Sequence, residues 1–123
     1  MAELHQALLV SFRKQLINKG YKEGKCPIQT YRPDIFCQKI DSSNEIREEI
    51  IVEVEIQSTL YYEHTSIQLI LMDEYIQSAR RKKYRILGYL LIPKNKIVLN
   101  LANSLLTSLF PDNCRIKVLQ RDI

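Results

Sequence analysis

The stretch IIVEVEIQ, residues 50–57, constrains the fold of this chain more than any other segment. Its alternation of apolar and polar residues is typical of a β-strand that turns one row of side chains to each side of a sheet. Charged residues are depleted inside strands, and an unpaired buried carboxylate is costly. The polar row must therefore face solvent or lie against something cationic. The two rows are Val52, Val54 and Ile56 on one face, and Glu53, Glu55 and Gln57 on the other.

Composition places the chain among ordinary globular domains. It has 123 residues, of which 46% are hydrophobic and 26% are charged, and these values exclude a disordered protein. We expect residues 1–123 to form a single domain with one core. With 18 Lys and Arg against 14 Asp and Glu, the net charge is +4, a mild preference for anionic partners.

Several features indicate a cytoplasmic protein that does not enter membranes. The longest apolar runs are too short to span a bilayer, and the first ten residues lack the basic start of a secretion signal. Cys26, Cys37 and Cys114 are odd in number and widely spaced, and neither histidine stands at a metal-ligand spacing from another ligand. We therefore expect reduced thiols and no zinc site.

Hydrophobic periodicity predicts a mixed α/β fold with the order helix, three strands, helix, strand, helix, strand. The first helix is expected to end at Gly20, and the second to begin with Thr65 as its N-cap. The second helix is long enough for a crossover, so the strands on either side of it should be parallel neighbours. The strands are expected at residues 25–31, 33–40, 47–60, 84–93 and 114–120, and the helices at 2–20, 66–84 and 97–110.

Acidic residues from two of these strands are expected to meet. A turn near Ser43 and Asn44 would place Asp34 opposite residues 53–55 of the next, antiparallel strand. Paired strands lie only about 4.8 Å apart. Asp34 and one or both glutamates of that range can then approach within the span of one divalent ion. Carboxylate oxygens are the ligands that Mg²⁺ or Mn²⁺ prefers.

These residues resemble the motif of the PD-(D/E)XK nuclease superfamily. Pro33 and Asp34 match the PD, and the acidic triplet is either Glu53-Val54-Glu55 or Glu55-Ile56-Gln57, the second being preferred. The element order from about residue 3 to residue 92 also resembles the restriction-endonuclease-like core. The resemblance implies a Mg²⁺- or Mn²⁺-dependent enzyme that hydrolyses phosphodiester bonds in DNA.

The same resemblance implies a role for each matching residue. Asp34 and Glu55 would hold the metal ion, with Glu53 as a second or spare ligand. Gln57 occupies the position of the family's lysine and could orient a water molecule, but it carries no charge. Glu3 matches an additional acid in the first helix, and Gln68 matches a polar residue of the second. A domain this small is also expected to use a homodimer or a protein partner.

Three other features have two interpretations each. The basic run Arg80, Arg81, Lys82 and Lys83 either contacts nucleic-acid phosphates or completes a helix end that favours cations. Tyr61, Tyr62 and Tyr75 either stack on bases or belong to the core. His64 either assists catalysis or lies at the surface before a helix. The alternative function is a non-catalytic interaction or accessory protein with the same fold.

Overall fold

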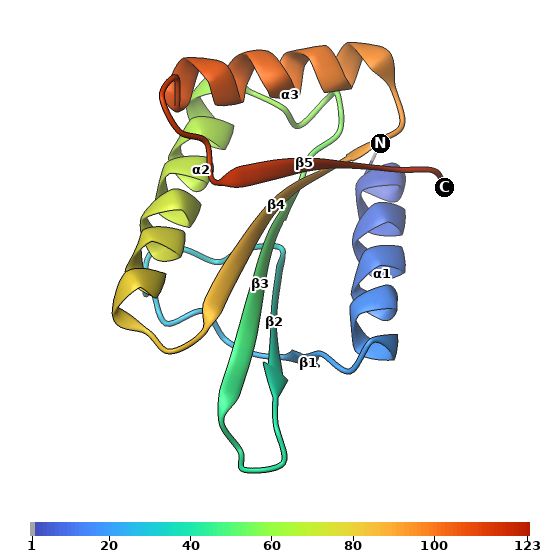
Figure 1. Ribbon diagram of the computed structural model, residues 1–123. Coiled ribbons are helices and arrows are strands. Elements are labelled where there is room, and N and C mark those ends of the chain that lie inside the picture. Colours follow the sequence, from blue (N-terminus) through green and yellow to red (C-terminus); the bar gives the residue numbers. More distant parts are fainter. Residues whose placement is uncertain (1) are drawn as a thin grey trace.

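The computed structural model describes residues 2–123, without the side chains of Ala2 and Arg80. Five strands form one sheet in the order β1-β2-β3-β4-β5, flanked by three α-helices (Figure 1). The element order agrees with the order predicted from the sequence. The elements are α1 (Ala2–Asn18), β1 (Lys22–Glu23), β2 (Ile35–Ile40), β3 (Ile46–Val54), α2 (Tyr62–Gln77), the 3₁₀-helix η1 (Ser78–Arg81), β4 (Arg85–Pro93), α3 (Lys96–Leu109) and β5 (Ile116–Arg121).

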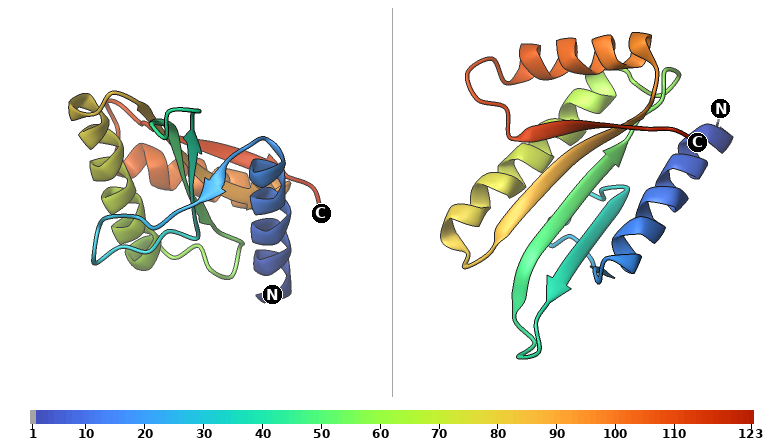
Figure 2. Two further views of the ribbon diagram at one scale, coloured as in Figure 1. Left: turned by 90° about the horizontal axis from the view of Figure 1, so that it is seen from below. Right: turned by 45° about the vertical axis from the view of Figure 1, so that its right-hand side comes forward.

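The sheet is mixed. β1 and β2 pair antiparallel, as do β2 and β3, whereas β3, β4 and β5 are parallel neighbours. The two parallel connections run through α2 and α3, as a crossover requires. α1 covers one face of the sheet, and α2 and α3 lie on the other (Figures 1 and 2). The predicted parallel pairing across the second helix is confirmed.

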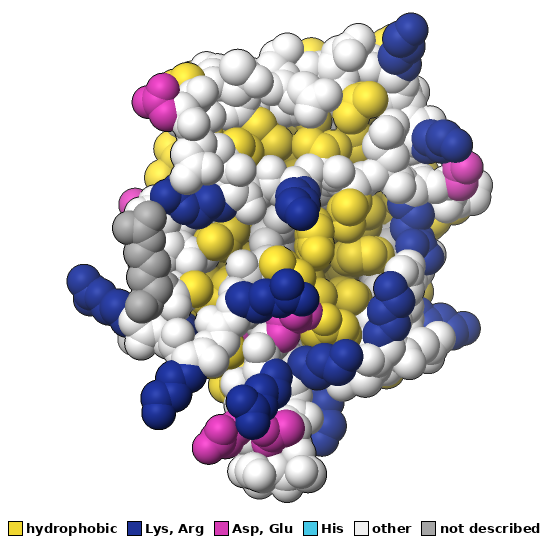
Figure 3. Space-filling view, viewed as in Figure 1, with side chains coloured by type: hydrophobic (Ala, Val, Ile, Leu, Met, Phe, Trp, Pro, Cys, Tyr) yellow, Lys and Arg dark blue, Asp and Glu magenta, His cyan; other side chains and the backbone are white. Residues whose placement is uncertain are grey.

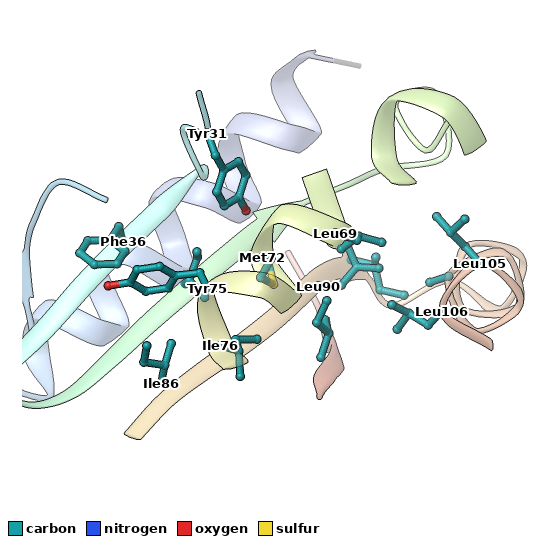
Figure 4. Close-up of a cluster of buried hydrophobic side chains, with 14 of the residues drawn as sticks. Tyr31, Phe36, Leu69, Met72, Tyr75, Ile76, Ile86, Leu90, Leu105 and Leu106 are labelled. Atoms are coloured by element: carbon teal, nitrogen blue, oxygen red, sulfur yellow. The ribbon is translucent and has the colours of Figure 1, made fainter. Parts of the chain in front are cut away.

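Each face of the sheet has its own hydrophobic core. On one face Leu8, Phe12 and Leu16 of α1 pack against the apolar row of β3 that includes Val52 and Val54. The α2 face holds the larger core, shown in Figure 4. There α2 approaches β4 so closely that a Cβ on Gly88 would lie 2.4 Å from Ile76 Cδ1. Glycine at this position is therefore a packing requirement.

Turn and cap residues fix the ends of the elements. Gly20 has a φ of 95° just after α1, the left-handed conformation that ends a helix. Asn44 has a φ of 63° in the tight turn between β2 and β3. Asn95 caps α3, because its side chain accepts hydrogen bonds from the N–H groups of Ile97 and Val98. No helix in residues 2–123 is long and apolar enough to cross a membrane.

Two predicted strands differ from the structure. Residues 25–31 form turns and bends instead of a strand, and Pro27 together with Pro33 explains why they leave the sheet edge. The first strand is the two-residue β1. β3 ends at Val54, six residues before the predicted end, because residues 57–59 form a turn.

The second helix also differs at both ends. It begins at Tyr62 with Tyr61 as N-cap, so Thr65 is wrong as the predicted cap. Thr65 lies one turn inside the helix, where its Oγ1 accepts a hydrogen bond from the N–H of Tyr61. At the other end the α-helix stops at Gln77 and continues as η1. Arg81 therefore belongs to the 3₁₀-helix, and Lys82 and Lys83 follow it.

Candidate functional site

Asp34 and Glu53 are joined by a reciprocal hydrogen-bonded arrangement at the start of β2. The Asp34 N–H donates to Glu53 Oε1 at 3.1 Å, and the Val54 N–H donates to Asp34 Oδ2 at 2.8 Å. This contact follows from the register, in which Ile35 pairs with Val52. The expectation that Asp34 lies opposite residues 53–55 is confirmed.

Both glutamates of the polar row are buried. Glu53 is 0% exposed and Glu55 is 4% exposed, because their face of β3 lies against the core that α2 and Tyr31 also enter. A solvated strand face is therefore excluded for these two side chains. Glu53 Oε2 and Glu55 Oε2 are both inaccessible to solvent and have no hydrogen-bond partner among the described residues. Buried polar atoms of this kind are uncommon and call for an explanation.

The two buried carboxyl groups resist ionisation. Burial raises the pKa of Glu53 to about 9; the charges of Asp34 and Glu55 contribute to the rise, and the Asp34 N–H opposes it. Burial also raises the pKa of Glu55 to about 7, against the effect of a hydrogen bond from Thr59. Near neutral pH, Glu53 is protonated and Glu55 is poised between its two forms. Binding of a cation would release these protons.

Two residues near the cluster were missed by the sequence reasoning. Tyr31 is buried beside Glu53, and its hydroxyl lies close enough to that carboxyl to act against the rise in the pKa of Glu53. Burial raises the pKa of the Tyr31 hydroxyl. Figure 4 shows Tyr31 at the edge of the core formed around α2. A tyrosine three residues before Asp34 carries no sequence signal beyond its hydrophobicity.

The second missed residue is His5 on α1. Its Nε2 lies 3.7 Å from Asp34 Oδ2, whereas Glu3 is exposed. His5 precedes the buried Leu8 and Leu9 by three and four residues, so it shares their side of the helix. The helical period of residues 5–9 therefore predicts that His5 lies on the buried side of α1. The position of α1 thus brings a histidine, rather than the predicted glutamate, to Asp34.

The two glutamines have different surroundings. Gln57 is exposed in the turn after β3, so it does not continue the polar row of the strand. Gln68 is half-buried on α2, and its Oε1 is inaccessible without a partner in the described structure. Together with Tyr31, Arg32 and His64, Gln68 lines a cavity of about 390 Å³.

The donors around Asp34 suit a hard cation in kind. They are carboxylate oxygens, two of which are buried and have no partner among the residues described, and such oxygens are the usual ligands of Mg²⁺ and Mn²⁺. The residues that the structure describes contain no group of three or more His, Cys, Asp or Glu side chains arranged to hold a metal ion. Asp34 and Glu53 instead bond to backbone N–H groups.

The predicted phosphate-binding run lies far from these carboxylates. α2 starts close after Glu55, and its 16 residues span about 24 Å before the basic run begins. Lys82 is engaged by aromatic rings, with its Nζ 4.5 Å from the centroid of Tyr75 and 5.5 Å from that of Tyr84. Arg81 and Lys83 are exposed, and the side chain of Arg80 lies outside the described residues.

Of the three tyrosines considered for base stacking, one lies in the core and two lie at the surface. Tyr75 is buried and packs edge-to-face on Phe36 with ring centroids 5.9 Å apart, while Tyr61 and Tyr62 are both 62% exposed. His64 is exposed on the first turn of α2.

Comparison of the chain with protein-family models, with curated proteins and with solved structures found no match.

Proposed function

We propose that this protein hydrolyses phosphodiester bonds in DNA with the help of a divalent cation, on a restriction-endonuclease-like core. One observation carries the proposal: Glu53, which accepts a hydrogen bond from the Asp34 N–H, and Glu55, whose pKa the charge of Asp34 helps to raise, are both buried, and each has an oxygen without a partner among the described residues. Burying carboxyl groups without partners costs free energy, so such groups cluster at functional sites. The order of elements supports the same assignment.

Asp34 and Glu55 are the proposed metal ligands, with Glu53 as a second ligand. When bound, a divalent cation supplies Lewis-acid chemistry, because it polarises the phosphate and lowers the pKa of a water molecule. Glu53 and Glu55 hold protons that must leave before a cation can bind. Cation affinity is therefore expected to rise with pH.

Other residues of the chain would position water and substrate. Gln57 lies in the exposed turn after β3, and its side-chain amide can donate a hydrogen bond to a water molecule and accept one from it. His5, 3.7 Å from Asp34, can orient that carboxylate. On the face that carries β5, Lys and Arg side chains are spread across the surface (Figure 3), which favours an anionic polymer.

Metal-dependent cleavage of plasmid DNA tests the proposal directly. Mg²⁺ or Mn²⁺ should support cleavage, and Asp34→Asn or Glu55→Gln should abolish it. Glu74→Gln is the matched control, since Glu74 is an exposed carboxylate on α2. Cleavage that persists in Asp34→Asn, or that occurs equally in EDTA, would overturn the assignment.

A thermal melt tests metal binding apart from catalysis. At ten times its dissociation constant, a cation should stabilise the protein by about 1.4 kcal/mol and raise the melting temperature by roughly 3–6 °C. Asp34→Asn should remove this shift. The shift should be larger at pH 8.5 than at pH 6, because protons compete with the cation for Glu55 and Glu53.

An interaction or accessory protein is the second candidate, and one observation favours it. Tyr62 and Leu101, from α2 and α3, are 62% and 45% exposed and line a common pocket of about 230 Å³. Apolar side chains that line one surface pocket together can receive an apolar side chain of a protein partner. No thermal shift at millimolar metal, with no cleavage, would favour this second function.

A further inference from the structure

A second cavity, of about 630 Å³, lies at the β1–β2 edge of the sheet and includes Asp34 in its lining. It exists because β1 is only two residues long and pairs with β2 only at Cys37 and Gln38. After Gly24, whose N–H donates to the Phe36 carbonyl, the chain leaves the sheet and returns at Asp34. The intervening segment encloses the space beside β2.

The cavity has a surplus of positive charge. Arg13, Lys25 and Arg32 line it. Arg13 is neutralised by an ion pair of 2.5 Å with Glu23, which also lines the cavity. Throughout residues 2–123, no carboxylate is found within ion-pair distance of Lys25 or Arg32. Two exposed cations thus face the cavity that Asp34 also enters.

The rest of the lining is apolar or aromatic. Ile28 and Cys26 are half-buried, and Phe36 and Tyr31 present buried rings. The cavity has the volume of an ordinary ligand pocket, and its lining is apolar except for a few charged groups. Such a cavity suits a small ligand that is flat at one end and anionic at the other. A nucleotide has this chemistry, because its base stacks on apolar surface and its phosphate pairs with cations.

We propose that this cavity seats one nucleotide of the substrate strand, with its phosphate against Arg32 and Lys25 and its base against Ile28 and Phe36. The inference rests on the proposed nuclease function, which puts the scissile phosphate near Asp34. A base inside the cavity cannot also be paired, so the substrate strand is unpaired at that nucleotide. The cations that hold substrate are then those near Asp34, and not the basic run after α2.

Thiol protection tests this directly, because the three cysteines sample three environments. Cys26 lines the cavity, Cys114 is exposed outside it, and Cys37 is 0% exposed. The protein is labelled with N-ethylmaleimide in EDTA and mapped by mass spectrometry, with and without deoxyadenosine monophosphate. Burial raises the pKa of the Cys26 thiol, so labelling is carried out at pH 8.5.

Millimolar nucleotide should slow labelling of Cys26 at least fivefold and leave Cys114 unchanged, while Cys37 stays unlabelled. Arg32→Gln combined with Lys25→Gln should remove the protection, and Arg81→Gln combined with Lys83→Gln should keep it. Equal protection by inorganic phosphate, or none by saturating nucleotide, would overturn the inference. The assay uses no metal, so its failure leaves the cleavage and melting tests of the nuclease function standing.

Discussion

Two pairs of acidic residues lie near the two ends of β3, and their surroundings differ sharply. Near its start, Glu49 is 1% exposed, and both of its oxygens accept hydrogen bonds. Tyr75 Oη donates to one oxygen at 2.5 Å, and Gln38 Nε2 donates to the other at 2.6 Å. Near the end of the strand, Glu53 and Glu55 are equally buried, and each retains an oxygen without a partner in the described structure.

Glu48, on the opposite face, is also fully supplied with donors. Its carboxylate accepts hydrogen bonds from the Tyr21 hydroxyl and, at 2.6 Å, from Arg85 Nε. Although burial acts against it, these two hydrogen bonds lower the pKa of Glu48. The surroundings of Glu48 therefore stabilise its ionised form, whereas those of Glu53 and Glu55 stabilise the protonated form.

The comparison separates a structural carboxylate from a candidate ligand. All four residues are glutamates, and Glu48, Glu49 and Glu53 lie on one strand, so residue type does not distinguish them. The supply of hydrogen-bond donors does. A buried acid whose two oxygens both accept hydrogen bonds contributes to folding, whereas one with an oxygen that lacks a partner is available to a cation.

The largest expected effect is a loss of stability as pH rises. The pKa values of about 9 for Glu53 and about 7 for Glu55 exceed the usual value of 4.5, so the folded state holds more protons than the unfolded state between these limits. Each carboxyl contributes a slope of up to about 1.4 kcal/mol per pH unit. Urea unfolding should show a free energy of unfolding lower by about 4 kcal/mol at pH 7 than at pH 5.

Two variants sharpen this prediction. Glu53→Gln combined with Glu55→Gln should flatten the slope between pH 5 and pH 7. Glu48→Gln should keep that slope but lessen the loss of stability in acid, because the lowered pKa of Glu48 contributes stability that disappears as pH falls below about 4.5. A wild-type protein that becomes more stable from pH 5 to pH 7 would contradict the contrast between the two ends of β3.

The second prediction concerns stability at fixed pH. Glu49→Ala removes the acceptor for Tyr75 and Gln38 and leaves a cavity, so the free energy of unfolding should fall by about 3 kcal/mol. Glu53→Gln at pH 7 should change it by less than about 1 kcal/mol, because Glu53 is already neutral there. Urea midpoints at constant slope provide the measurement.

A double-mutant cycle is the control for Glu49. If the Tyr75 hydroxyl bond is a main part of its effect, Glu49→Ala and Tyr75→Phe together should cost clearly less than the sum of the single changes. Equal losses for Glu49→Gln and Glu53→Gln at pH 7, which leave no large cavity, would show that the two carboxyl groups do not differ in the way described.

The sequence predicted the framework of this contrast but not its chemistry. Alternation in residues 50–57 gave the strand and the facing of Glu53 and Glu55, and the turn at Asn44 gave the register with Asp34. These follow from local patterns. That the polar row is buried depends on α2 packing over it, a long-range contact that strand periodicity alone cannot reveal.

The errors have the same origin. The polar row ends before Gln57 because β3 stops at Val54, where the chain turns toward α2. Tyr31 reaches Glu53 only because residues 24–34 leave the sheet, and the prediction placed a strand there. The position of a side chain relative to a remote element is a tertiary property, so the donors and acceptors that complete a site were the least predictable part.

The smallest expected effect tests how far the network at the start of β3 extends. Lys82 Nζ donates to the Tyr75 hydroxyl at 3.2 Å and lies over its ring, while Lys83 is exposed. Lys82→Ala should therefore lower the free energy of unfolding by roughly 0.5–1 kcal/mol, and Lys83→Ala should change it by less than about 0.5 kcal/mol. Urea unfolding measures both. If the two substitutions instead leave stability equal and weaken DNA binding equally, Lys82 serves the nucleic acid, and Glu49 and Tyr75 form a network complete without it.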